Sequence, residues 1–130
     1  MSTRSRIGFK TEKGTIESVY CHCDGYPAYN GKLLLNYYNS LELAKQIVEL
    51  GDISSLGKTL KQEDTCSYNR WRNENTIKRI DKNKAEYKKK YGTNGEEYIY
   101  LFENGKWYVY DDVTYTKFTL LETIEECKEV

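Results

Sequence analysis

The chain has 130 residues, of which 38% are hydrophobic and 31% charged, and its 20 basic and 20 acidic side chains give a formal net charge of zero. This length suits one domain, residues 1–130, with a core that needs no disulfide bonds, and thirteen tyrosines, two tryptophans and three phenylalanines predict that the core is aromatic. Because the sequence has no apolar run of bilayer length and no apolar leader, we expect a soluble, cytoplasmic protein without a membrane partner.

Charge is unevenly distributed along the chain. Residues 1–60 carry seven basic and six acidic side chains, residues 61–95 carry ten and five, and residues 96–130 carry three and nine. The middle of the chain is therefore basic and its end acidic. Such a split can steer a charged partner, although the two segments can equally pack together and neutralise each other.

Residues 3–22 have the pattern of a β-hairpin. Ile7 and Phe9 alternate with Arg6 and Gly8 in the first apolar run, and a polar turn precedes the second run. Successive side chains of a strand point to opposite faces. We therefore expect Ile7 and Phe9 to face the core, while the face that carries Arg4 and Arg6 is exposed to solvent or in contact with other groups.

The stretch YCHCDGYP, which follows this hairpin, contains the only histidine, the only proline and two of the four cysteines. An extended backbone sends Cys21 and Cys23 to one face and His22 to the other, so these three side chains cannot bind one metal ion. A site of four thiolates that adds Cys66 and Cys127 is an alternative, but small buried thiols are favoured. We predict no metal and no cofactor, and free thiols in a reducing compartment.

A second reading of the same stretch is catalytic. His22 and Asp24 are two residues apart, and an extended backbone would put both on one side, as a carboxylate-oriented imidazole requires. The sequence offers no nucleophile motif, phosphate loop or second histidine to complete such a site. We therefore predict that His22 hydrogen-bonds across the sheet or to the loop, and that the protein is not an enzyme.

The DGYP residues also have a structural interpretation as a tight turn. We expect the Asp24 side chain to cap the turn, Gly25 to adopt a left-handed backbone and Pro27 to hold Tyr26 extended. Tyr26, Tyr29, Tyr37 and Tyr38 would then cluster around the junction, where their phenol groups either seal the core or face a ligand.

The remaining elements are expected in this order. Residues 31–50 predict two consecutive helices, the second capped by Ser40 and ended by Gly51. Residues 51–75 predict mostly loop with a short strand or turn, and residues 74–91 predict a very basic helix with a narrow apolar stripe.

Residues 96–110 predict a second hairpin around Asn104-Gly105, whose first strand is apolar on both faces and therefore central. Residues 118–128 predict an amphipathic helix. The expected fold class is α+β, a small antiparallel sheet built from the two hairpins and covered on one side by the helices.

The text TRSRIGF, the hairpin glycine and then YCHCDGYPAYNGKLLLNYY resemble a widespread group of small, uncharacterised proteins of phages and prophages. Members of this group open with Thr-Arg and carry a D-G-Y-P, Gly, Leu-Leu pattern, and they often have tryptophan at the position of Cys23. The resemblance covers roughly the first fifty residues. It implies a phage origin, and it brings no known activity with it.

Small soluble phage proteins outside the virion often bind a host defence component, so the first functional hypothesis is an inhibitor that binds a host defence protein or ribonucleoprotein, such as a CRISPR effector. The second is a binder of a nucleotide signal, in which arginines contact phosphate and tyrosines stack. The third is a nucleic-acid-binding module, for which the neutral total charge is a handicap. A hydrolase that uses His22 and Asp24 ranks last.

Candidate binding residues for these hypotheses come from three parts of the chain. They are Arg4 and Arg6 in the first strand, His22, Asp24, Tyr26 and Tyr29 around the turn, and Arg70, Trp71, Arg72, Lys78 and Arg79 in the basic segment.

Overall fold

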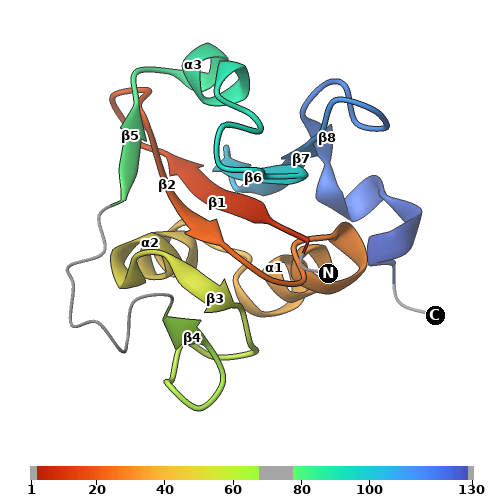
Figure 1. Cartoon of the computed structure of the whole chain (residues 1–130). Coiled ribbons are helices and arrows are strands. Elements are labelled where there is room, and N and C mark those ends of the chain that lie inside the picture. Colours follow the sequence, from red (N-terminus) through yellow and green to blue (C-terminus); the bar gives the residue numbers. More distant parts are fainter. Residues whose placement is uncertain (1–2, 68–77, 129–130) are drawn as a thin grey trace.

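One mixed sheet of eight strands forms the centre of the protein in the computed structural model, which describes residues 3–67 and 78–128 (Figure 1). In chain order the strands are β1 (Ser5–Lys10), β2 (Ile16–Cys21), β3 (Ile53–Ser55), β4 (Cys66–Ser67), β5 (Arg79–Asp81), β6 (Tyr98–Glu103), β7 (Lys106–Tyr110) and β8 (Thr119–Leu120). The helical segments are the π-helix η1 (Pro27–Gly31), the α-helices α1 (Lys32–Tyr37), α2 (Leu41–Leu50) and α3 (Lys84–Lys89), and the 3₁₀ turns η2 (Leu121–Thr123) and η3 (Glu125–Cys127). The α+β class is confirmed.

Both expected hairpins are present. β1 pairs with β2 and β6 pairs with β7, each antiparallel and in continuous register. The turn between β6 and β7 is made by Asn104 and Gly105, whose φ angles are +52° and +77°. Positive φ at both central residues is what a type I′ turn requires, so the Asn-Gly signal is confirmed.

The sheet is mixed, whereas the sequence predicted an antiparallel one. The strand order is β4-β3-β2-β1-β6-β7-β8, with β5 also pairing to β2. The two hairpins meet through their first strands, which run parallel from Ser5 beside Tyr98 to Phe9 beside Phe102. Parallel pairing is possible because the long segment between the hairpins carries the chain back across the sheet before β6 begins.

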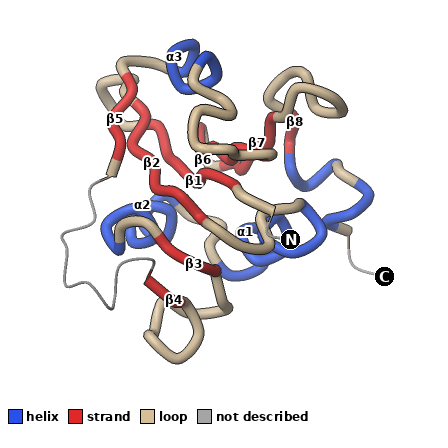
Figure 2. The backbone as a smooth tube through the Cα atoms, in the orientation of Figure 1, coloured by secondary structure: helices blue, strands red, loops and turns tan. Residues whose placement is uncertain are grey.

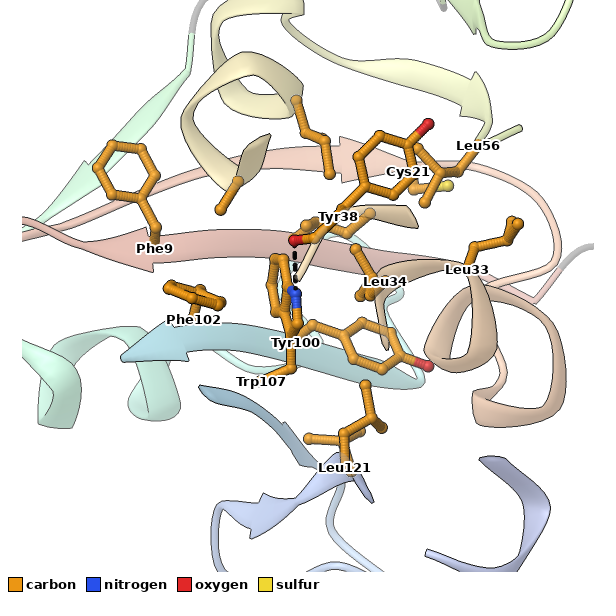
Figure 3. Packing of buried hydrophobic residues seen from close by; sticks show 14 of the residues in the cluster. Phe9, Cys21, Leu33, Leu34, Tyr38, Leu56, Tyr100, Phe102, Trp107 and Leu121 are labelled. Atoms are coloured by element: carbon orange, nitrogen blue, oxygen red, sulfur yellow. Dashed lines mark hydrogen bonds between the residues drawn. The ribbon is translucent and has the colours of Figure 1, made fainter. Parts of the chain in front are cut away.

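The main core lies between the sheet and the helices α1 and α2 (Figure 2). Phe102 and Trp107 meet edge to face, with 5.2 Å between ring centroids, and the indole Nε1 of Trp107 donates a hydrogen bond of 3.0 Å to the carbonyl of Tyr38 (Figure 3). Leu34, Ile47 and other aliphatic side chains fill the space around these rings. The aromatic core predicted from composition is therefore present, and a tryptophan fastens it to the end of α1.

The opposite face of the sheet is also covered, whereas helices were expected on one side alone. Tyr87 of α3 packs with Ile99 and Leu101 of β6 in a smaller cluster. Its hydroxyl donates to the carbonyl of Tyr100 at 2.7 Å. Since β6 is apolar on both faces and lies between β1 and β7, it needs cover on both, as its sequence indicated.

The helical predictions for residues 31–50 are confirmed in their main points. α1 and α2 are consecutive, the Ser40 hydroxyl accepts a hydrogen bond from the Leu43 amide at 3.2 Å, and α2 ends at Gly51 with a φ of +90°. A π-helical turn, η1, precedes α1. The sequence did not predict that turn.

The predicted helix over residues 74–91 is wrong in extent. Residues 79–81 form β5, and α3 covers only Lys84–Lys89 after the side chain of Asn83 caps it. The supposed apolar stripe fails because Ile80 is 57% exposed whereas its neighbour Asp81 is buried. An alternating pattern of this kind belongs to a strand.

The C-terminal helix over residues 118–128 is also wrong. The chain forms β8 and then the 3₁₀ turns η2 and η3. Phe118, Leu121, Ile124 and Cys127 recur every three residues. Leu121, Ile124 and Cys127 pack in the main core, whereas Phe118 packs in the smaller cluster around Tyr87, so the four residues do not form one stripe of a single helix.

Candidate functional site

The turn after β2 is built differently from its predicted form. Asp24 takes the left-handed backbone, with a φ of +58°, while Gly25 is needed for close approach. A Cβ at Gly25 would lie 2.5 Å from the Cβ of Ser5. The Gly25 amide donates to the carbonyl of Thr3 at 2.8 Å, and its carbonyl accepts from the Tyr100 hydroxyl at 2.6 Å. Tyr26 is extended before Pro27, as predicted.

His22 lies beside Tyr20 at the end of β2. The Tyr20 hydroxyl and His22 Nδ1 are 2.8 Å apart, and the His22 amide donates to the carbonyl of Ile53 at 3.0 Å. The positive φ of Asp24 ends the extended run at that residue. The premise that an extended backbone aligns His22 with Asp24 is therefore wrong.

The two predicted arginines of the first strand have different environments. Arg6 is 5% exposed, and its Nε lies 3.1 Å from the Glu96 carboxylate. Arg6 also donates to the Ser18 hydroxyl at 3.1 Å. Arg4 is exposed, and its guanidinium lies against Gly95. Because a buried charge needs its partner, Arg6 serves the interior of the fold, and Arg4 is the arginine of this pair that solvent reaches.

Three tyrosines are exposed along one continuous segment. Tyr26 precedes η1, Tyr29 lies within it and Tyr37 ends α1, with exposed fractions of 39%, 37% and 43%. The rings of Tyr26 and Tyr29 are 6.3 Å apart, and the ammonium of Lys58 lies 5.8 Å from the Tyr37 ring. Tyr29 and Tyr37 both border residues 56–58, because the Tyr29 hydroxyl contacts the Leu56 carbonyl and Lys58 lies against the Tyr37 ring. We call Tyr26, Tyr29 and Tyr37 the tyrosine face.

The tyrosine face adjoins the connection between β3 and β4, residues 56–65, which we call the β3–β4 loop. The Tyr29 hydroxyl donates to the carbonyl of Leu56 at 3.2 Å, and the Tyr38 hydroxyl donates to that of Gly57 at 2.5 Å. Burial and the nearby acidic groups raise the pKa of Tyr38 to about 12. These two phenols tie the loop to the helical segment.

The two described binding candidates of the basic segment, Lys78 and Arg79, both form ion pairs. Lys78 pairs with Glu17 at 2.6 Å, and Arg79 pairs with the buried Asp81 at 3.0 Å. Arg70, Trp71 and Arg72 lie outside the described residues. The structure therefore does not bring Lys78 or Arg79 to the tyrosine face, and both are used in contacts within the fold.

The four cysteines are thiols and do not form disulfide bonds. Cys21 and Cys127 are buried, and burial raises the pKa of both thiols, that of Cys127 to about 11. Within residues 3–67 and 78–128 no three side chains of the metal-ligating types come together as a candidate metal site. The Cys127 thiol packs against η1 and donates a hydrogen bond to the carbonyl of Pro27 at 3.2 Å.

An open groove of about 800 Å³ lies between α2 and the tip of the first hairpin, lined by Phe9, Leu41 and charged residues that include Lys45 and Lys78. Its walls carry both signs of charge. The tyrosine face and the residues of the DGYP turn are not among its lining. Among the described binding candidates from the sequence, Lys78 alone lines this groove.

No protein family, curated protein or solved structure matches this chain. Among the described helices, none has the length and apolar character needed to cross a membrane.

Sequence reasoning placed Tyr26, Tyr29 and Tyr37 together at the junction, but it missed the β3–β4 loop. It also placed Tyr38 with them, which is 2% exposed. The loop gave no periodic signal, since its shape depends on single hydroxyl groups.

Proposed function

We propose that this protein is a phage-derived accessory protein that inhibits a host defence system, for example a CRISPR effector, by binding one of its proteins stoichiometrically. The resemblance of the first fifty residues to a phage protein group supports the origin. The tyrosine face supports the mode of action, and it is the observation on which the proposal depends.

Exposed tyrosines suit a protein interface for physical reasons. A phenol offers a large contact area with few rotatable bonds and a hydroxyl that can be satisfied by a partner. Tyrosine is enriched among the residues that contribute most to binding. In this chain Tyr38, Tyr87 and Tyr100 are fully buried, so the tyrosine face is not explained by a general surplus of tyrosine on the surface.

The alternative of a nucleotide binder has weaker support. It needs accessible arginines near the DGYP tyrosines, and because the Arg6 guanidinium is committed to Glu96 and Ser18, Arg4 is the one accessible arginine of that pair. The nucleic-acid alternative needs unpaired basic charge. Lys84 and Lys90 of the α3 region pair with Glu103 and Asp81, which reduces the positive charge available to phosphates.

A panel of purified CRISPR effector ribonucleoproteins tests the proposal through target cleavage at increasing ratios of inhibitor to effector. We expect one effector to be inhibited near equimolar ratio. The variants Tyr26→Ala and Tyr37→Ala should each weaken binding to that effector by roughly thirtyfold, the effect of losing one major contact residue. Ile80→Ala, which removes an exposed apolar side chain from β5, is the matched control and should bind normally.

Two results would reject the proposal. One is normal cleavage by every effector in the panel at excess inhibitor. The other is a rise in melting temperature with cyclic nucleotides or ADP-ribose derivatives and no protein binding, which would establish the nucleotide alternative instead.

A further inference from the structure

The β3–β4 loop is held in one shape by a small network of hydroxyl groups. The Thr65 hydroxyl accepts from the Gly57 amide at 2.9 Å and donates to the Thr59 carbonyl at 2.7 Å. The Thr59 hydroxyl in turn donates to the Asp64 carboxylate at 2.5 Å. Thr65 is 2% exposed, so its two hydrogen bonds are shielded from water.

The backbone of the loop is also closed on itself. The amides of Asp64 and Thr65 both donate to the carbonyl of Lys61 at 2.9 Å. A Cβ at Gly57 would lie 2.2 Å from the carbonyl oxygen of Asp64. The two ends of the loop are therefore in direct contact, and only glycine permits that contact at position 57.

The loop is anchored in the core at two leucines. Leu56, at its start, is fully buried, and Leu60, near its middle, is partly buried against the main cluster. The exposed side chains of the loop are those of Lys58, Thr59, Lys61, Gln62, Glu63 and Asp64. Figure 1 shows the loop projecting from one end of the molecule, beyond β3 and β4.

The chemistry of this tip selects the kind of partner. Two lysines and two acidic residues give it no net charge, so it lacks the positive field that a phosphate backbone requires. A projecting, ordered and neutral loop fits a concave protein surface. Its order matters because a segment already fixed in its bound shape loses less conformational entropy on binding.

We propose that the β3–β4 loop inserts into a cleft of the protein partner while the tyrosine face packs against the rim of that cleft. This inference rests on the proposed function and adds the shape of the partner's site to it. The hydroxyl of Tyr29 couples the two parts, because it contacts the carbonyl of Leu56 from within the tyrosine face.

A bulky side chain at the tip tests insertion directly. Gln62→Trp adds an indole at an exposed position. The fold has room for this ring, whereas a cleft closed around the tip would have none. We expect at least a hundredfold loss of affinity for the effector inhibited in the panel, with an unchanged melting temperature. Val113→Trp, at a position 86% exposed in another turn, is the matched control and should bind as the unaltered protein does.

The order of the loop is tested by Thr65→Val, which keeps the shape of the side chain and removes both hydrogen bonds, with Thr65→Ser as the variant that retains the hydroxyl. We expect Thr65→Val to dissociate about tenfold faster because the loop must be ordered on binding, and Thr65→Ser to dissociate at the normal rate. Faster amide hydrogen exchange within the loop should accompany the change.

The outcomes separate this inference from the function on which it rests. If no effector is inhibited by the unaltered protein, the proposed function fails and the insertion model fails with it. If an effector is inhibited, Tyr26→Ala weakens binding and Gln62→Trp binds normally, the insertion model alone is overturned. Normal dissociation of Thr65→Val with accelerated loop exchange would show that loop order does not contribute to binding.

Discussion

At the scale of single residues, the turn after β2 depends on close contact more than on backbone conformation. Asp24 tolerates a positive φ because a short polar side chain can occupy the left-handed region. Gly25 has an ordinary backbone but no room for a side chain, because Ser5 lies against it. The left-handed residue of the turn is therefore Asp24, whereas Gly25 was predicted to have that conformation.

This division predicts the effect of two glycine substitutions. Gly25→Ala should lower the free energy of unfolding by about 3 kcal/mol, the upper end of the range for overpacking a rigid site. Gly14→Ala is the matched comparison, because Gly14 has a φ of +88° and open space around its Cβ position. It should cost about 1 kcal/mol, from backbone strain alone. Urea denaturation measures both, and equal losses would contradict the contact explanation.

At the scale of elements, local signals were reliable where a single residue type determines the geometry. Asn104-Gly105 predicted its turn, Ser40 its cap and Gly51 its helix end. The existence of both hairpins followed from alternation and turn residues. These features depend on neighbours in sequence, and one sequence is enough to read them.

Elements whose form depends on distant packing were not predictable in this way. β5 exists because residues 79–81 pair with the free edge of β2, and its sequence RID was equally compatible with a helix. Likewise the pairing of β1 with β6 requires knowledge of the chain path. For the candidate site the sequence indicated Tyr26 and Tyr29, but the burial of Arg6 follows from Glu96, ninety positions away.

The cap of α2 gives a test at this scale. Ser40→Ala removes the acceptor for the Leu43 amide and should lower the free energy of unfolding by about 1 kcal/mol. Ser40→Asp retains an acceptor and should be close to the unaltered protein. Should both variants lose the same stability in urea denaturation, the hydroxyl would not act as a cap.

At the scale of the whole molecule, buried thiols and phenols predict how stability depends on pH. Burial, followed by the Glu126 charge, raises the pKa of Cys127 from 9.0 to about 11. In the unfolded chain this thiol ionises near pH 9, whereas the folded protein holds its proton. Its contribution is therefore complete below pH 9 and is lost as the pH rises toward 11.

The urea midpoint should accordingly fall between pH 9 and pH 11, and fall less steeply in Cys127→Ala, which has no thiol to ionise. Tyr38 and the other tyrosines whose pKa is raised contribute equally to both proteins over this interval. The difference between the two slopes therefore measures the contribution of Cys127 ionisation. Identical slopes would show that Cys127 ionises normally in the folded state.

The parallel contact between β1 and β6 has a consequence for synthesis on the ribosome. Ser5 pairs with Tyr98 and Phe9 with Phe102, so the first strand to emerge cannot pair with its neighbour until about ninety more residues have been translated. At ordinary elongation rates this takes roughly 5 to 20 seconds. During that interval one edge of the nascent hairpin and the apolar side chains of α1 and α2 lack their final cover, and they are the surfaces a chaperone would meet.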